Sequence, residues 1–326
     1  MLRIHFTEAD LGKTRVARAP DPLWELVLSV HKLADPRPGT VFGDWRERAL
    51  TEVRERRLGG ALAHVGELVP RAGYFPDFLT PPDTPASLAE GLDAVCRTPR
   101  SRLRRDLAYA AKRRRLAPWT ADLARGDRRV LGDVAEAFRL FHDAALAPEW
   151  DRVAESVISD AARRAHAFHD EGVHGLLGSL RPTLRWEPPV LSADYPARYG
   201  VLDIRLDGRG LRLIPSYFCW RTPVALVDPE LPPTVVYPVE RPRSHAPDRA
   251  AALAAAIGRP RARTLLALAV PATTGELAAR LGTSAASASE HTSALRTAGL
   301  VTSHRVGRTV LHSRTRLGTA LAEGGF

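Results

Sequence analysis

Apolar positions in the first three-quarters of the chain recur first at helical spacing and later with the two-residue period of strands. Leu2, Ile4 and Phe6 alternate with polar residues and predict an N-terminal strand. Helical periodicity then predicts helices over residues 23–33, 45–57, 87–95, 100–114, 130–145 and 150–168, the first of them amphipathic and preceded by Pro22. Strand patterns follow over residues 190–192, 201–206, 211–217 and 234–239. Helices followed by strands predict an α+β domain for residues 1–245.

Turn-forming residues punctuate this pattern at two places. Asp207-Gly208 separates two predicted strands and favours a tight hairpin between them. The segment Tyr74–Asp83 carries three prolines and three aromatic residues and predicts a rigid loop.

Residues 273–282 have the local signals of a short helix with defined ends. Thr273 and Glu276 fit a capping box at its start. Leu277 and Leu281 recur at helical spacing, and Gly282 favours the left-handed conformation that ends a helix. Either Thr283 or Ser284 then caps a second helix.

The second helix and the residues after it complete a compact pattern. Ala288, Thr292 and Leu295 form its inward face, and Gly299 ends it. Residues 302–305, 306–308 and 309–313 predict a strand, a turn and a return strand. Upstream, residues 248–257 predict an Ala-rich connecting helix, and Arg259-Pro260 opens another helix whose core residues are Leu265, Leu266 and Leu268. Residues 246–326 therefore predict a helix-turn-helix followed by a β wing.

The runs Gly258–Leu268, Gly275–Gly282 and Ser287–Val301 resemble the ArsR-type winged-helix repressors. The best-matching positions are His291, Leu295-Arg296 and Ala298–Val301, and the resemblance covers about the last quarter of the chain. It implies a homodimer that binds double-stranded DNA. The expected DNA-binding residues are Ser284, Ala285, Ala286, Ser287, Ser289, Glu290, His291 and Arg296 on the second helix, with Arg305 and Arg308 on the wing.

Two departures from this family change the expectation. The metal-sensing members carry a Cys-x-Cys pair where this chain has Thr273 and Gly275. A second metal site of the family uses carboxylates and His on a C-terminal helix, whereas the tail of this chain after Leu317 holds only one acid, Glu323. Neither metal site of the family carries over. Where many relatives place Gln and Arg, this chain has Ala285 and Glu290. We therefore expect little direct base readout and more dependence on the wing and on DNA shape.

The balance of charge agrees with a DNA partner. The 326 residues carry a formal charge of +10 and a pI of about 10.3, and residues 248–326 hold ten Arg against four acids. Candidate phosphate contacts are Arg261, Arg263, Arg280 and Arg296. A second basic run covers residues 100–115, for which a second DNA contact and a solvated helix face both stay open.

The large N-terminal region also resembles a region attached to a subgroup of ArsR-like regulators in GC-rich bacteria. The residues that carry this likeness are Asp21–Glu25, Tyr74–Pro82 and Leu213–Phe218. It adds family identity and no chemistry.

Other candidate chemistry in this region is sparse. Gly12-Lys13-Thr14 ends like a phosphate-binding loop, but the glycine needed five residues earlier is Thr7. His166, His169 and Asp170, together with His174, form a metal candidate, with ordinary surface or core histidines as the alternative. The six tryptophans either line a ligand pocket or simply fill the core.

Cysteine usage and hydropathy bound the location. Cys96 and Cys219 are too few for a disulfide framework or a zinc ribbon, and we expect them reduced. No apolar run approaches the roughly 20 residues of a membrane span, and the N-terminus does not have the pattern of a signal peptide. These features predict a cytoplasmic protein.

Together the patterns predict a homodimeric, sequence-specific DNA-binding transcription regulator, of which we expect a repressor. It has no expected catalytic residue, metal or cofactor. Residues 1–245 are expected to act in sensing or dimerisation, with control by a small-molecule effector or a partner as a hypothesis. The alternative is an enzyme or a protein-interaction module with an attached winged helix.

Overall fold

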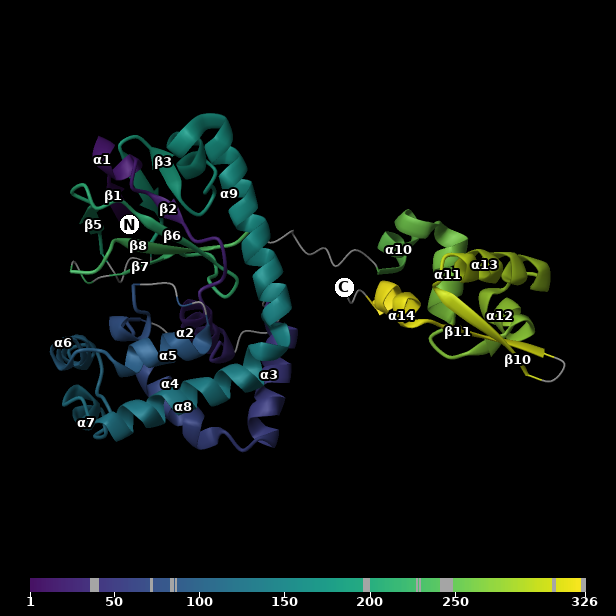
Figure 1. Ribbon diagram of the computed structural model, residues 1–326, viewed down its shortest axis with the longest axis horizontal. Helices are drawn as coiled ribbons and strands as arrows, with labels where there is room; N and C mark the ends of the chain where they lie inside the picture. Colours follow the sequence, from purple (N-terminus) through teal and green to yellow (C-terminus); the bar gives the residue numbers. More distant parts are fainter. Residues whose placement is uncertain are drawn as a thin grey trace. The chain divides into compact units, whose positions relative to one another are not determined.

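The chain forms two units that each combine helices with sheets (Figure 1). The computed structural model describes residues 1–35, 41–70, 73–82, 85, 87–195, 200–226, 228, 230–240, 249–306 and 309–323. Contacts within the chain divide it into Met1–Glu240 and Arg241–Phe326. The expected boundary, between residues 245 and 246, falls in the stretch 241–248 outside the described residues. The chain is therefore an α+β protein, as its pattern predicts.

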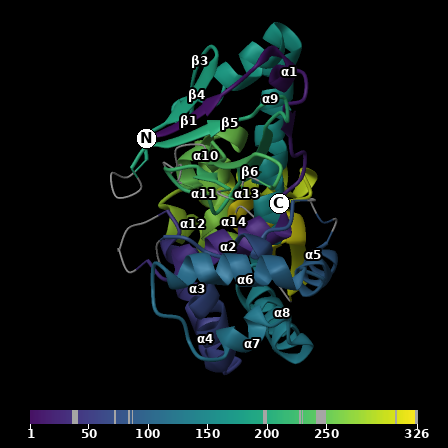
Figure 2. The same cartoon turned by 90° about the vertical axis from the view of Figure 1, so that its left-hand side faces the viewer.

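Helices gather on one side of the N-terminal unit and strands on the other, while α9 (Trp150–Gly178) runs alongside both (Figures 1 and 2). The other helical elements are α1 (Glu8–Leu11), α2 (Pro22–Leu33), α3 (Gly43–Glu55), α4 (Gly59–Leu68), η1 (Asp77–Leu79), α5 (Leu88–Cys96), α6 (Arg100–Ala111), α7 (Thr120–Ala124), α8 (Arg128–Ala145) and η2 (Ala147–Glu149). The six predicted helices are present, although α6 ends at Ala111 and α9 continues ten residues beyond Phe168. The pattern misses α4, in which three glycines dilute the apolar period.

The helix α2 is not amphipathic, contrary to the expectation from its sequence. Every residue from Pro22 to Val30 is buried, including Glu25 and Ser29. Asp21 caps its start by accepting hydrogen bonds from the amides of Leu23 (3.2 Å) and Trp24 (3.3 Å). The helix lies between the other helices and a sheet, so all of its faces are covered and its few polar groups find partners inside the protein.

Two four-stranded sheets and the helical layer stack as three layers. The first sheet has the order β3 (Arg185–Glu187), β4 (Val190–Ala193), β1 (Leu2–His5), β5 (Leu202–Arg205). The second has the order β2 (Arg15–Val16), β6 (Arg212–Ser216), β8 (Thr234–Pro238), β7 (Val224–Ala225). Leu213 and Val235 pack with the core of the first sheet, whereas Ile214 and Val236 pack with the helices. The second sheet is thus the middle layer, which explains why β6 and β8 carry apolar residues on both faces.

The predicted hairpin at Asp207-Gly208 is wrong, although the turn itself exists. Asp207 and Gly208 have φ of 52° and 78°, as a tight turn requires. The strands on either side nevertheless belong to different sheets, because β5 pairs in parallel with β1 and β6 pairs in parallel with β2 and β8. Asp10 of α1 accepts a hydrogen bond from the Gly210 amide (2.8 Å) and helps to direct the chain from one sheet to the next.

The long helix α9 is joined to the middle sheet through a buried carboxylate. Asp160 is fully buried and accepts hydrogen bonds from Tyr237 Oη (2.8 Å) on β8 and from Arg164 Nη2 (2.8 Å). Residues Glu171 and Gly172 leave the helical conformation, Gly172 at φ 63°, and kink the helix.

Among the described residues, no helix is both long enough and apolar enough to cross a membrane.

One buried carboxylate fastens the helical layer to the middle sheet. Glu25, in the first turn of α2, accepts hydrogen bonds from the amides of Tyr217 (2.7 Å) and Phe218 (2.9 Å) and from Ser216 Oγ (3.0 Å). These donors stand at the end of β6, where the strand stops and its amides lose their partners in the sheet. The position at the helix N-terminus further favours the negative charge.

We expect Glu25→Ala to lower the free energy of unfolding by about 3 kcal/mol or more, because it leaves three buried donors without this acceptor. Urea unfolding followed by tryptophan fluorescence measures the change. Glu47→Ala, at an exposed position on α3, is the control and should change stability little. Equal stability of the two variants would contradict this role of Glu25.

The buried carboxyl of Asp77 makes stability depend on pH. Burial raises the pKa of Asp77 to about 7, and the nearby carboxylates of Asp106 and Asp228 add to the effect. Between about pH 4 and 7 the folded protein therefore holds a proton that the unfolded chain releases, and stability falls as pH rises through this window. We expect Asp77→Asn to flatten the fall, by up to about 4 kcal/mol at about 1.4 kcal/mol per pKa unit. Thermal unfolding at pH 4 and pH 8 tests this, with the exposed Asp44→Asn as control.

Candidate nucleic-acid interface

The C-terminal unit consists of short helices and a small antiparallel sheet. Its elements are α10 (Arg249–Ile257), α11 (Arg259–Ala267), β9 (Ala272–Thr273), α12 (Thr274–Leu281), α13 (Ala285–Thr297), β10 (Val301–Val306), β11 (Thr309–Arg314) and α14 (Arg316–Glu323). The three strands have the order β10-β11-β9 (Figure 1). Leu265, Leu268, Leu277 and Leu295 meet in one core, whereas Leu266 is only partly buried and packs at its edge.

Local capping fixes the turn between α12 and α13. Thr273 and Glu276 form the expected capping box, with the Thr273 amide donating to Glu276 Oε2 at 2.8 Å. Gly282 adopts the left-handed conformation at φ 64° and ends α12. Ser284 then caps α13 by accepting a hydrogen bond from the Ser287 amide (3.1 Å). These contacts confirm the predicted ends of α12 and the predicted start of α13, and they set the angle at which α13 leaves the turn.

One face of α13 is core and the other is open. Ala288, Thr292 and Leu295 are buried, as predicted. Of the candidate residues, Ala285, Ala286, Ser289, Glu290 and Arg296 are exposed, and His291 is half-buried. Ser284 and Ser287 are engaged with each other in the cap, their Oγ atoms 3.1 Å apart. The structure thus places most of the candidates on solvent-facing positions of α13, where the side chains are small except for Glu290 and Arg296.

Of the two wing candidates, Arg305 and Arg308, only Arg305 on β10 lies within the described residues. The strands β10 and β11 pair from Val301↔Arg314 to Val306↔Thr309, which places Arg305 opposite Val310 near the end of the ladder. Arg305 is exposed. The other wing candidate, Arg308, lies outside the described residues.

Three arginines of this unit donate to main-chain carbonyls of the same unit. Arg263 Nη2 donates to Leu281 O (3.0 Å), and Arg280 Nη1 donates to Ala267 O and Val270 O. Arg314, which sequence reasoning missed, donates to Leu265 O and Leu266 O, both at 2.8 Å. These guanidinium groups satisfy carbonyls that helix ends leave open, so Arg263 and Arg280 have structural work besides any contact with phosphate. Arg261 remains exposed.

A buried histidine joins the helices to the sheet. His312 on β11 has its ring nitrogens 2.9 Å from Thr274 Oγ1 and 2.8 Å from Ser303 Oγ. Burial lowers the pKa of His312, and the charge of Arg296 lowers it further. A neutral ring therefore connects the start of α12 to β10. Only its alternation within the strand could have marked this residue as inward-facing.

The histidine candidates of the N-terminal unit do not converge. His166 and His169 are exposed on α9, and His169 Nδ1 lies 3.9 Å from Asp170 Oδ1. His174 instead accepts a hydrogen bond from Trp186 Nε1 (3.1 Å). No group of three or more His, Cys, Asp or Glu in the described part of the chain could hold a metal ion. Cys96 and Cys219 are not joined in a disulfide.

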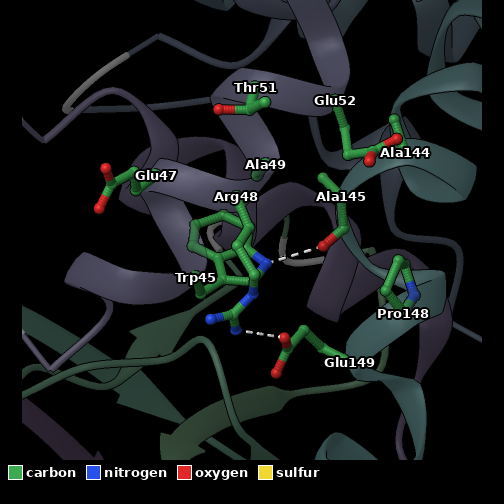
Figure 3. A pocket seen from close by; sticks show the side chains of 10 residues that line it. All are labelled: Trp45, Glu47, Arg48, Ala49, Thr51, Glu52, Ala144, Ala145, Pro148 and Glu149. Carbon is green, nitrogen blue, oxygen red and sulfur yellow. Dashed lines mark hydrogen bonds and ion pairs between the residues drawn. The ribbon is translucent and has the colours of Figure 1, made fainter. Parts of the chain in front are cut away.

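A shallow concavity of about 370 Å³ opens between α3 and the end of α8 (Figure 3). Trp45 lines it, but its indole Nε1 donates to Ala145 O (2.7 Å). Arg48 and Glu149 form an ion pair at its rim. None of the other five tryptophans lines it, and Trp24 and Trp186 are buried in the two hydrophobic cores. The tryptophans therefore do not share this concavity as a ligand site.

Comparison of the chain with family models, with curated proteins and with solved structures gave no match.

Two glycines of the C-terminal unit should respond oppositely to the same substitution. Gly282→Ala should lower stability by about 1 kcal/mol, because φ is positive there. Gly275→Ala should raise it by up to about 1 kcal/mol, because the position is helical and its added methyl meets open space. All six tryptophans precede residue 225, so hydrogen exchange of α12 and α13 amides is the proper readout. Changes of the same sign would contradict the assigned turn.

Proposed function

We propose that the chain is a sequence-specific DNA-binding transcription regulator whose C-terminal unit is a winged helix-turn-helix module. The observation that carries the proposal is the open face of α13: Ala285, Ala286, Ser289 and Glu290 point to solvent from a helix whose other face completes the core. Such a helix can enter a major groove without disturbing the fold.

Charge supports the same partner. The sequence from residue 248 to 326 carries +6. Arg296 is exposed on α13, and Arg305 is exposed on β10. Phosphate contacts from such cations give most of the affinity of DNA-binding proteins and fix their register on the duplex.

The small side chains of α13 bear on how sequence is read. Alanine contacts a thymine methyl, and the Glu290 carboxylate accepts from a cytosine amino group but is repelled by phosphate. Direct readout is therefore limited, and the β10–β11 pair and DNA shape supply the remainder. His291 is half-buried on the same helix and adds an imidazole that can hydrogen-bond to a base or a phosphate.

The resemblance to ArsR-type repressors extends the proposal to a homodimeric repressor without the metal sites of that family. Thr273 is committed to the capping box and Gly275 lies inside α12, so the positions of the missing Cys-x-Cys pair serve the helix start. A homodimer matches two-fold symmetric operators with half-sites about one helical turn apart. Control then falls to the N-terminal unit, through an effector or a partner.

An attached enzyme and a protein-interaction module are the competing functions. Metal analysis of the purified protein addresses the first. Absence of any DNA binding would favour the second.

We expect the full chain to bind DNA from upstream of its own gene roughly a thousand-fold or more tighter than unrelated duplex, with affinity falling steeply as salt rises. The double variant Arg296→Ala with Arg305→Ala should weaken binding and reduce the salt slope by about 0.9 for each phosphate that the protein no longer neutralises. Fluorescence anisotropy across salt concentrations measures both quantities.

A matched control and a rejecting outcome make this test decisive. Arg3→Ala with Arg205→Ala removes the same charge from exposed positions of the N-terminal unit and should leave the preference for the upstream sequence unchanged. Equal affinity for all duplexes, unaltered by Arg296→Ala with Arg305→Ala, would reject sequence-specific regulation by this module.

A further inference from the structure

The charge of the N-terminal unit is concentrated in one short segment. Residues 97–129 hold twelve Arg and Lys against three Asp, a net charge of +9. The rest of residues 1–240 holds 23 Arg and Lys against 30 Asp and Glu, a net charge of −7. A general preference for arginine in the proteins of the organism would raise the arginine content throughout the unit. It therefore does not account for this separation of charge.

The fold brings the cations of this segment onto neighbouring elements. Arg100 and Arg104 lie one turn apart on the exposed face of α6, and Lys112 and Arg115 follow just beyond its end. The stem of Arg100 packs beside Gly126, which brings the exposed Arg128 and Arg129 at the start of α8 next to the start of α6. Helix α7 lies beside α6 in both views (Figures 1 and 2). We call these six exposed cations the basic surface: Arg100, Arg104, Lys112, Arg115, Arg128 and Arg129.

Three other cations of the segment have carboxylate partners, whereas the basic surface does not. Arg105 pairs with Asp228 and Glu230, Arg114 with Glu67, and Arg125 with Asp122. None of the six forms an ion pair with another described residue. The carboxylate nearest to them in sequence, Asp127, caps α8 by accepting from the amides of Arg129 and Val130. The basic surface therefore presents charge outward.

We propose that the basic surface is a second DNA-contacting surface, which binds the phosphodiester backbone of duplex DNA without reading its sequence. This inference rests on the proposed function in one respect: the ligand of the basic surface is the DNA that the C-terminal unit binds. Cations one helical turn apart are spaced by about 5.4 Å, and each DNA strand offers a charge every 3.4 Å or so along the axis. Arginine matches phosphate oxygens through paired N–H donors.

The chemistry of the surface favours nucleic acid over a lipid bilayer. Surfaces that bind anionic membranes combine cations with exposed large apolar side chains that enter the bilayer. The large hydrophobic residues that the described part of the chain exposes, among them Ile158 and Phe168, all lie outside residues 97–129. A surface of cations without such side chains suits a ligand that offers charge alone.

The test uses the full chain with Arg104→Gln, Lys112→Gln and Arg115→Gln combined. The matched control combines Arg3→Gln, Arg57→Gln and Arg205→Gln, which are exposed and lie outside the segment. Anisotropy against the upstream duplex and an unrelated duplex, each several helical turns long, gives affinity and salt slope. We expect the basic-surface variant to bind both duplexes about ten-fold or more weakly, with a slope smaller by about 1 to 3, and the control to change little.

The outcomes separate this inference from the proposed function. Equal weakening of binding to both duplexes, with the sequence preference retained, supports the inference. Weakening of binding by a parent protein that shows no sequence preference also supports the inference, but it rejects the proposed function. Slopes and affinities equal to those of the control overturn it. Co-sedimentation with vesicles of phosphatidylserine and phosphatidylcholine that the basic-surface variant loses, together with unchanged DNA binding, also overturns it in favour of a membrane.

Discussion

The N-terminal unit depends on the way a single buried charge is satisfied. A helix and a strand end come together there because the Glu25 carboxylate takes up two main-chain amides and one hydroxyl that neither water nor the sheet can reach. The same contact decides the order of layers, since it holds α2 against the middle sheet on one side while the other helices cover it from behind. Asp160 repeats the arrangement for α9 at β8, the strand next to β6, where Tyr237 of the strand and Arg164 of the helix supply the donors.

The features predicted correctly from the sequence are those whose physics is local. A capping box at Thr273 and a left-handed Gly282 involve residues within a few positions of each other, so the ends of α12 could be read directly. The turn at Asp207-Gly208 was equally local and equally present. The pairing of the strands on either side of it was not local, because β5 pairs in parallel with β1 and β6 with β2, both near the start of the chain. Burial of α2 on every side likewise came from elements distant in sequence.

In the candidate interface, too, the features set by local sequence could be predicted, and those set by distant residues could not. Which residues of α13 face outward followed from the helical period, and the structure has Leu295 inside and Ala285, Ser289 and Glu290 outside. The roles of the arginines could not be predicted in this way. The sequence does not show whether a guanidinium faces solvent or donates a hydrogen bond to a main-chain carbonyl. Arg280 and Arg314 close the open end of α11, whose carbonyls lie many residues away from them. Charge counts along the chain therefore overstate how many arginines are wholly available to a partner.

The sparse outer face of α13 has a consequence for how such a module changes over time. Ala285, Ala286 and Ser289 are exposed, while the helix is held by a cap, a tight turn and an inward row that includes Leu295. Substitutions at these outward positions add side chains without opening a cavity or disturbing the core, so their cost to stability is small. The outer face of α13 is thereby uncoupled from the face that folds the unit. Substitutions can accumulate on the outer face while the inward row stays under separate selection.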